Sequence, residues 1–430
     1  MLNGKTVILG VSGGIAAYKA AALCSALKQG GADVYVLMTE HAKEFVGAAT
    51  FEALSGHRVI TDTFESSEFL IPHIRLAHLA DLFVAAPATA NLIAKLACGI
   101  ADDMLTSTFL ACTCPKLIVP AMNVNMYDNP ATVDNLALLK KRGITLLEPD
   151  TGHLAEGLSA KGKMPEPSVI YRQIEYMIGC KKDLSGKKIV ITAGPTEEAL
   201  DPVRFLTNHS SGKMGYALAK AAAQRGACVV LISGHVQEAG DGVENALLCG
   251  TGTGSSPEAV LMPAGVRRVR IRSAVQLAEA VKAESRGADC VIMAAAVADF
   301  TPAYPADEKL KKTQMQPETD ESGQEIYTLR LKRTEDVLSW LGAHKEPGQV
   351  LVGFSMETRD LVENSRKKLR EKHADLIVAN NLKEPGAGFG TDTNIVTLID
   401  QNGEKGLPIL SKEETAHCVL DAAFGINGEN

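Results

Sequence analysis

The residues of this sequence that can bind an anion stand where apolar, strand-like runs end. Ser12 and Gly13 lie in GVSGG, which follows such a run and opens a helical pattern. A turn of this kind presents backbone N–H groups and the positive end of a helix to a phosphate, and Ser12 can add a hydroxyl donor. Thr89 stands in PATAN, which also follows a strand-like run and begins a helix. Because neither string is GxGxxG, a tight turn and a helix cap are the respective alternatives.

Three further polar residues of the amino-terminal half can carry chemistry. Thr39 ends the second predicted strand, and Asn123 follows a later strand in PAMNVNMY. Both therefore belong to the carboxyl edge of the sheet, where open α/β sheets bind ligands. His73 lies in the predicted loop segment IPHIRLAHLADL and can exchange a proton near neutral pH. A structural histidine and an asparagine cap are the alternatives for His73 and Asn123.

The carboxyl-terminal half carries a second set of polar residues. Arg204 and Asn208 lie in the polar, glycine-rich stretch DPVRFLTNHSSGKMG, and Arg204 can clamp a phosphate or carboxylate with two hydrogen bonds. Asp299 ends AAAVADF, which reads as a buried strand, so its carboxylate can bind a ribose hydroxyl or a metal ion, or cap a helix. Lys368 and Lys372 stand one turn apart on a predicted helix. A solvated loop and solvated lysines are the alternatives.

The elements that position these residues alternate between strand-like and helix-like patterns. Strand, helix, strand in this order predicts βαβ units and parallel sheets, and hence an α/β fold with two Rossmann-like domains. We expect domains at residues 1–180 and 189–430, joined by a polar linker at 181–188. The predicted strands cover residues 6–9, 33–38, 81–86, 116–119, 189–193, 228–233, 289–297, 350–354 and 375–379.

Composition narrows the possible functions. The chain has 430 residues and a net charge of -7, from 44 Lys and Arg against 51 Asp and Glu. That balance disfavours a general nucleic-acid binder, which carries a basic excess. No apolar run approaches the about 20 residues that span a bilayer, and the start lacks a signal-peptide pattern. Nine scattered cysteines without metal or redox spacing predict a reduced, cytoplasmic protein and identify no metal ligands.

The amino-terminal domain resembles the flavin-dependent cysteine decarboxylases. The resemblance rests on GVSGGIAAYKA at 10–20, HIRLAHLADLFVAAPATANLIAKLACGIADDMLTST at 73–108 and PAMNVNMY at 120–127. It implies a flavodoxin-like fold, FMN as cofactor, and His73 and Asn123 as active-site residues. The residues that it implies for holding FMN are Ser12, Gly13, Thr39, Ala88 and Thr89.

The implied reaction oxidises the thiol of a cysteine amide to a thioaldehyde with FMN, after which carbon dioxide leaves and the product is reduced. His73 would be the acid or base, and Asn123 would hold the departing carboxylate. Glu156 in LAEG stands where the family has a cysteine that helps the reduction. A buried carboxylate can donate a proton but cannot perform thiol redox chemistry. Two alternatives are therefore open: a complete decarboxylase with Glu156 as a catalytic residue, and a flavin domain impaired in the final reduction.

Residues 184–425 resemble the CTP-using phosphopantothenate–cysteine ligases. The resemblance rests on ITAGPTEEALDPVRFLTNHSSGKMG at 191–215 and on AAAVADF, DEKLKK, VGFSMET and ADLIVAN further along. It implies an acyl-cytidylate handled by Arg204 and Asn208, Lys309 as a catalytic residue and Mg²⁺ as a cofactor. The family's Asn-Pro-Asp is Thr334-Glu335-Asp336 here. The implied CTP-binding residues are Met293, Ala294, Ala295, Asp299, Lys309, Asp336, Phe354, Lys368 and Lys372.

The order of the two halves resembles the bifunctional enzymes of coenzyme A biosynthesis, in which the ligase product is the decarboxylase substrate. It implies 4'-phosphopantothenate, cysteine and CTP as substrates, with no nucleic-acid or membrane partner. The flavin decarboxylases of this kind form trimers and the ligases form dimers. The resemblance therefore implies a closed homo-oligomer, a dodecamer.

Three other functions are alternatives to this hypothesis. A nicotinamide-dependent oxidoreductase is disfavoured because no GxGxxG string follows either first strand. A non-catalytic flavoprotein is disfavoured because His73 and Asn123 are retained. An enzyme that modifies a carboxyl-terminal cysteine of a peptide needs no clamp thiol, but the attached ligase half disfavours it.

Overall fold

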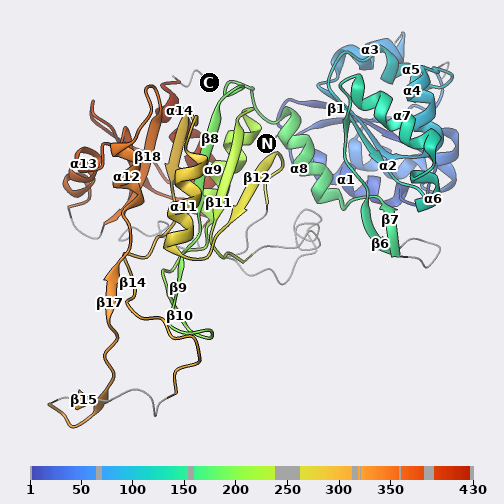
Figure 1. Ribbon diagram of the computed structural model, residues 1–430. Coiled ribbons are helices and arrows are strands. Elements are labelled where there is room, and N and C mark those ends of the chain that lie inside the picture. Colours follow the sequence, from blue (N-terminus) through green and yellow to red (C-terminus); the bar gives the residue numbers. More distant parts are fainter. Residues whose placement is uncertain are drawn as a thin grey trace. The chain divides into compact units, whose positions relative to one another are not determined.

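A computed structural model describes residues 2–63, 70–153, 159–237, 262–311, 318–319, 321–357, 360–381 and 392–426 (Figure 1). The chain divides into two compact units, with the boundary between Cys180 and Lys181. Each unit has its own sheet and its own helices.

The first unit is built on a five-stranded parallel sheet with the order β2-β1-β3-β4-β5. This order places a topological switch between β1 and β3, as in flavodoxin-like folds. The connection after β1 leads to β2 on one side, whereas β3, β4 and β5 are added on the other side. The strands are β1 (Thr6–Val11), β2 (Asp33–Met38), β3 (Leu82–Ala88), β4 (Lys116–Pro120) and β5 (Thr145–Leu146). The helices are α1 (Ala17–Gln29), η1 (Glu40–Glu44), α2 (Ala48–Ser55), α3 (Pro72–Leu79), α4 (Ala90–Cys98), α5 (Met104–Ala111), α6 (Val124–Tyr127), α7 (Pro130–Lys141) and α8 (Pro167–Ile178). A two-stranded antiparallel hairpin, β6 (Asp150–His153) and β7 (Ser159–Lys163), precedes α8.

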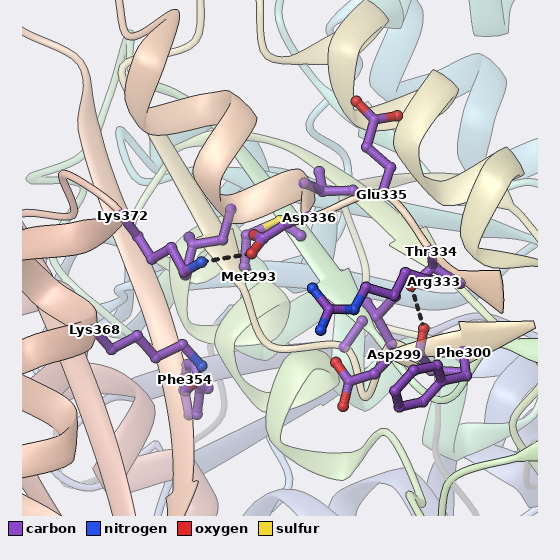
Figure 2. A pocket seen from close by; sticks show the side chains of 15 residues that line it. Met293, Asp299, Phe300, Arg333, Thr334, Glu335, Asp336, Phe354, Lys368 and Lys372 are labelled. Atoms are coloured by element: carbon purple, nitrogen blue, oxygen red, sulfur yellow. Dashed lines mark hydrogen bonds and ion pairs between the residues drawn. The ribbon is translucent and has the colours of Figure 1, made fainter.

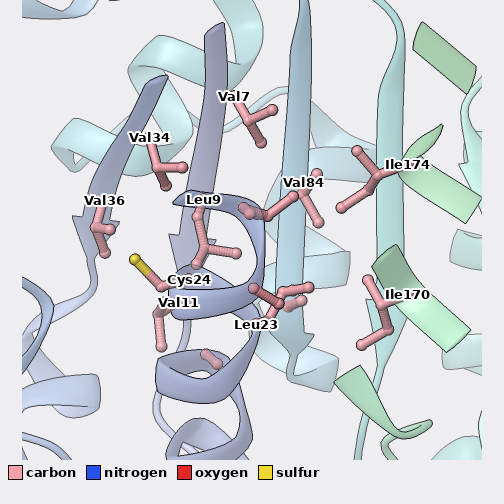
Figure 3. Close-up of a cluster of buried hydrophobic side chains, with 14 of the residues drawn as sticks. Val7, Leu9, Val11, Leu23, Cys24, Val34, Val36, Val84, Ile170 and Ile174 are labelled. Carbon is pink, nitrogen blue, oxygen red and sulfur yellow. The ribbon is translucent and has the colours of Figure 1, made fainter. Parts of the chain in front are cut away.

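Both faces of this sheet are buried, which explains the continuous apolar runs of its strands. Val7 and Leu9 of β1 face one way and pack with Leu23 of α1 and Ile170 of α8 (Figure 3). Ile8 faces the other way, into a cluster with side chains from α3, α4 and α5. Each such buried side chain contributes about 1.5–3 kcal/mol relative to an exposed one. The two clusters fix the strands and so fix the position of the turns beyond them.

The second unit is built on an eight-stranded sheet with the order β12-β11-β8-β13-β18-β19-β21-β22. The first six strands are parallel and the last two are antiparallel to their neighbours. Its topological switch lies between β8 and β13. The strands are β8 (Lys188–Ala193), β11 (Cys228–Ser233), β12 (Val266–Arg270), β13 (Cys290–Met293), β18 (Val350–Glu357), β19 (Leu376–Asn381), β21 (Val396–Ile399) and β22 (Glu404–Gly406). The helices are α9 (Lys213–Gln224), α11 (Ala274–Glu284), α12 (Val337–Ala343), α13 (Leu361–Glu371) and α14 (Lys412–Phe424).

Short two-stranded ribbons accompany this sheet, and the ribbon of β14 and β17 projects beyond it (Figure 1). That ribbon connects the loop after β13 to the start of α12. The ribbon strands are β9 (Glu197–Ala199) with β10 (Phe205–Thr207), β14 (Phe300–Pro302) with β17 (Leu331–Arg333), β15 (Glu318–Thr319) with β16 (Glu325–Ile326), and β20 (Thr393–Asn394) with β23 (Leu410–Ser411).

The predicted α/β fold with two Rossmann-like domains is confirmed, and three local predictions differ from the structure. The strand expected over 289–297 ends at Met293, because the N–H groups of Ala295 and Ala298 donate to side-chain hydroxyls of neighbouring turns instead of to a strand. His73 lies on α3 instead of in a loop, since Pro72 can occupy the first helical turn. Within the expected linker, Leu184 is buried and Asp183 pairs with Arg225, so this segment packs on the second unit.

The first residue of α14 predicts a pH dependence of stability. Lys412 is buried, and burial, followed by the nearby Lys213, lowers its pKa to about 8. Between about pH 8 and pH 10 the unfolded chain therefore binds more protons than the folded chain, so stability rises with pH. Relative to Lys412→Met, we expect the wild type to gain about 1–3 kcal/mol in free energy of unfolding over this interval.

Urea unfolding at a series of pH values measures this gain. The exposed Lys367 gives a matched control. Lys367→Met also removes one positive charge, but the amine of Lys367 is exposed to solvent, unlike that of Lys412. The prediction would be contradicted if the free energy of unfolding changed with pH in the same way in the wild type and in both variants between about pH 8 and pH 10.

Candidate active sites in the two units

A serine hydroxyl joins two turns at the carboxyl edge of the first sheet. Ser12 directly follows β1, and its Oγ donates to the carbonyl of Pro87 at 2.8 Å. The same oxygen accepts the backbone N–H of Thr89 at 2.9 Å. Thr89 in turn caps α4 by accepting the N–H of Leu92 at 3.3 Å. Because the single proton of Ser12 is committed to Pro87, its role is to shape the two turns rather than to donate to an anion.

The turn after β2 completes this edge. A Cβ added at Gly13 would lie 2.4 Å from the Cβ of His41, so this position accepts only glycine without rearrangement. The N–H of Thr39 donates to the carbonyl of Val11 at 3.0 Å. Its hydroxyl Oγ1 is buried and has no hydrogen-bond partner among the described residues. Since an unpartnered buried hydroxyl costs about 1–3 kcal/mol, a polar ligand fits here.

The strand ends of β3 and β4 place Ala88 and Asn123 on the same edge. The N–H of Ala121 donates to the carbonyl of Ala88 at 3.1 Å, and Asn123 Oδ1 accepts the N–H of Asn125 at 2.7 Å to cap α6. Strand β7 lies against this loop, because the N–H of Met122 donates to the carbonyl of Gly162 at 3.1 Å. The base of the β6–β7 hairpin is therefore held beside Asn123.

The two remaining residues predicted for this site are placed less directly. His73 stands in the first turn of α3, and its Nδ1 is buried without a partner in the part of the chain that the structure describes. It forms no hydrogen bond to the strand-end residues. Glu156 falls between β6 and β7 in the sequence, outside the described residues. The edge thus brings together the turns of four strands, and the buried Oγ1 of Thr39 lies there without a hydrogen-bond partner among the described residues.

In the second unit, the loop after β13 is held by hydrogen bonds from the neighbouring turns. The hydroxyl of Thr192 accepts the N–H of Ala295 at 3.0 Å, and that of Thr196 accepts the N–H of Ala298 at 3.0 Å. Asn208 Nδ2 donates to the carbonyl of Val297 at 3.0 Å. From the other side, Thr334 Oγ1 donates to the carbonyl of Ala298 at 2.6 Å. The loop that carries Asp299 is therefore fixed before any ligand binds.

This loop forms one wall of a pocket with a volume of about 600 Å³ (Figure 2). The opposite wall comes from β18, α12 and α13. Predicted CTP-binding residues that line the pocket are Met293, Ala295, Asp299, Asp336, Phe354, Lys368 and Lys372. Two predicted residues, Ala294 and Lys309, do not line it. The residues that sequence reasoning missed are Val297, Ala298, Phe300, Arg333, Thr334, Glu335, Val337 and Leu338.

Most charged side chains of this pocket have partners within the protein. Lys372 Nζ contacts Asp336 Oδ2 at 2.6 Å, and Lys368 Nζ donates to the carbonyl of Phe354 at 2.8 Å. Burial opposes ionisation of Asp336, but the hydrogen bond from Lys372 and the helix-capping N–H of Ser339 lower its pKa overall. The pocket therefore presents fixed lysines beside apolar side chains, which suits a base or sugar bound next to a phosphate.

Arg204 is engaged differently from the prediction. Its guanidinium binds the buried carboxylate of Asp201, and its Nη2 donates to the carbonyl of Leu310 at 2.9 Å. The N–H of Leu310 donates back to Asp201 at 3.2 Å. The hydrogen bond from Arg204 holds the pKa of Asp201 well below its usual range, although desolvation opposes this. Arg204 thus fixes the segment that carries the exposed Lys309.

The described residues contain no cluster of three or more His, Cys, Asp or Glu side chains suited to a metal ion. Over the same residues, no helix is long and apolar enough to cross a membrane. Any divalent cation in the pocket would therefore need oxygen ligands from a bound substrate as well as from the protein.

Comparisons with known proteins identify the family. Residues 1–179 match the model of the Flavoprotein family, and residues 184–248 and 253–425 match that of the DNA/pantothenate metabolism flavoprotein C-terminal domain. The chain is 49% identical to the coenzyme A biosynthesis bifunctional protein CoaBC of Bacillus subtilis, over 99% of this chain and 96% of the relative. It is 44% identical to the CoaBC protein of Mycobacterium tuberculosis, over 97% and 96%.

The chain belongs to the CoaBC family. The predicted membership is therefore confirmed, and the chain is an enzyme with a flavoprotein half and a ligase half. Among solved structures, the C-terminal domain of a CoaBC protein matches with 38% identity and a TM-score of 0.42, over 56% of this chain and 95% of that one. A PPC decarboxylase mutant complexed with pantothenoylaminoethenethiol matches with 33% identity and a TM-score of 0.37, over 40% and 96%.

The close contact at Gly13 predicts the effect of a single added methyl group. In Gly13→Ala the Cβ would also lie 2.8 Å from the carbonyl carbon of His41, so the turns after β1 and β2 must separate. We expect a loss of about 1–3 kcal/mol in stability and a clear fall in bound flavin per polypeptide. Visible absorbance and thermal unfolding of the purified variant measure both effects.

Gly14→Ala is the matched control, because its Cβ would lie 3.5 Å from Thr89 Cγ2, an ordinary contact. Equal amounts of bound flavin in the two variants would show that the close contact between Gly13 and His41 is not needed for flavin binding.

Proposed function

We propose that this chain catalyses two consecutive steps of coenzyme A biosynthesis. The second unit joins 4'-phosphopantothenate to cysteine at the expense of CTP, and the first unit decarboxylates the product, 4'-phosphopantothenoylcysteine, with FMN. The observation that carries this proposal is the pocket of the second unit, where seven residues predicted from sequence motifs for CTP line one cavity. Family membership over nearly the whole chain supports the pairing of the two activities.

The ligation proceeds in two steps, through an acyl-cytidylate. The carboxylate of 4'-phosphopantothenate attacks the α-phosphorus of CTP, and pyrophosphate leaves. The amine of cysteine then attacks the acyl-cytidylate, and CMP leaves. Asn208 fixes the loop at Val297 that must hold the mixed anhydride, and Lys309 supplies positive charge near the phosphates.

Mg²⁺ fits this pocket through Asp299. The carboxylate of Asp299 forms no ion pair with any described residue, and Mg²⁺ is commonly held by one or two carboxylates together with substrate phosphates. When bound, the ion would offset the negative charge of the triphosphate. The lysines and the fixed loop bind and orient the nucleotide from the remaining sides.

The decarboxylation uses the edge of the first sheet. FMN would be held by the turns at Ser12, Gly13, Thr39, Ala88 and Thr89, and it supplies the two-electron oxidation chemistry that makes loss of carbon dioxide possible. The buried Oγ1 of Thr39, which has no partner among the described residues, supports a phosphate or other polar group at this place. His73 exchanges a proton at its buried Nδ1, and Asn123 holds the departing carboxylate through its side-chain amide.

Glu156 decides whether the first unit completes its reaction. In the complete reaction, Glu156 donates the proton of the final reduction step. The alternative is an active ligase joined to a flavin unit impaired at this step, because a carboxylate cannot replace a thiol in redox chemistry.

We also propose that the chain forms a homo-oligomer in the cytoplasm, a dodecamer with trimeric flavin units and dimeric ligase units. Exposed apolar side chains in both units support contacts between copies. Ile15 beside the glycine turn is 64% exposed, and Tyr304 on the β14–β17 arm is 80% exposed. Sedimentation velocity of the full chain measures the assembly.

The main test uses the purified full chain with 4'-phosphopantothenate, cysteine, CTP and Mg²⁺, followed by mass spectrometry of the products. We expect 4'-phosphopantetheine and carbon dioxide. Accumulation of 4'-phosphopantothenoylcysteine, or of its oxidised decarboxylated form, would favour the impaired flavin unit. In that case Glu156→Cys should restore the final product, and a failure to restore it would locate the block elsewhere.

Two substitutions separate the halves. His73→Asn should lower release of carbon dioxide by about 10²–10⁴-fold because the acid–base group is lost. Asn208→Asp should slow the second ligation step, so that acyl-cytidylate accumulates. Each variant controls for the other, since ligation in His73→Asn and decarboxylation of supplied 4'-phosphopantothenoylcysteine in Asn208→Asp should stay at the wild-type rate. Normal turnover in either affected half would remove that residue from the mechanism.

A further inference from the structure

The pocket of the second unit contains one cation that the predicted nucleotide site does not use. Arg333 ends β17, lines the pocket, and points into it between Asp299 and Asp336 (Figure 2). Its guanidinium forms neither a hydrogen bond nor an ion pair with any residue that the structure describes, although its backbone pairs with Phe300. An arginine held at a pocket wall without a protein partner has five donors available for an anion.

Among the described residues, the two lysines of the pocket have protein partners, whereas the guanidinium of Arg333 has none. Lys372 is paired with Asp336, and Lys368 donates to the carbonyl of Phe354. Glu335, the carboxylate nearest to Arg333 in sequence, contacts Lys282 instead. A highly charged ligand therefore gains most from the side of the pocket where Arg333 lies.

The position of Arg333 also indicates which part of the nucleotide it meets. The inner wall is apolar, with Met293 only 9% exposed and Leu338 also buried. Arg333 is exposed and stands opposite Phe300 in the β14–β17 ribbon, at the solvent side of the pocket. A base and ribose suit the inner wall, whereas a phosphate chain suits the exposed cationic rim, from which a leaving group can depart.

We infer that Arg333 binds the β- and γ-phosphates of the nucleoside triphosphate and so stabilises the pyrophosphate that leaves in the first ligation step. The inference rests on the proposed function, and it adds a binding residue that the motifs did not indicate. The planar guanidinium can bind two phosphate oxygens at once, which a lysine cannot reproduce. The backbone of the next residue, Thr334, donates to the carbonyl of Asp299 at 3.0 Å, so Arg333 is held in register with the loop after β13.

Calorimetric titration of the full chain with CTP and with CMP, in the presence of Mg²⁺ and without 4'-phosphopantothenate, tests this inference. We expect Arg333→Ala to weaken binding of CTP about 10- to 100-fold, because charge-assisted hydrogen bonds are lost, and to leave binding of CMP within about two-fold of the wild type. Arg333→Lys should give an intermediate loss for CTP, since it keeps the charge without the fork.

Lys332→Ala is the matched control. Lys332 is the neighbouring exposed cation of β17 and points to the other face of the ribbon, and it does not line the pocket. Its removal changes the net charge equally and should leave CTP binding unchanged. A loss in Arg333→Ala that is equal for CTP and CMP, or equal to that of Lys332→Ala, would overturn the inference. If the wild type itself fails to bind CTP, the proposed function fails instead, which keeps the two failures distinct.

Discussion

The hydroxyl of Ser12 accepts the N–H of Thr89 and donates to the carbonyl of Pro87, and the first candidate site depends on that bridge. The turns beyond a parallel sheet have backbone groups that no strand can pair, and a buried group without a partner is costly. A side-chain hydroxyl that both accepts and donates satisfies two of these groups at once. The second unit uses the same solution, with Thr192 and Thr196 accepting N–H groups of the loop after β13.

The same constraint fixes the loop after β13 in the second unit. The loop at Val297 is held by Asn208 from one turn and, next to it at Ala298, by Thr334 from another. A loop that is already fixed loses little conformational freedom when a nucleotide binds. Phosphate groups can then meet charges that do not need to rearrange, which is the physical basis of electrostatic preorganisation.

The basic side chains in and near the pocket are also held in place by other groups of the protein. Lys372 and Lys368 are held in place by an acidic side chain and a backbone carbonyl, so their positions are set before binding. Arg204 is held by the buried Asp201, and together they fix Leu310 beside Lys309. These cations, or the segments that carry them, are thus held in place by other groups of the protein.

The sequence by itself determined the parallel sheets, the strand-end turns and seven of the fifteen residues that line the pocket of the second unit. These features are local, since a glycine turn or a polar residue directly after an apolar run occupies the carboxyl edge wherever the strand lies in the sheet. Even Asp299 was expected at the correct edge, although its strand ends earlier, at Met293.

Only the tertiary structure decided the partners of the side chains. Arg333 joins the pocket because β17 pairs with β14 across a long intervening segment, and no local pattern marks that pairing. Arg204 was expected to clamp a ligand, but the fold brings Leu310 to its guanidinium. The one proton of Ser12 was expected to face a phosphate, yet Pro87 takes it. A sequence shows which groups can form hydrogen bonds, whereas the register of distant segments selects the bonds that form.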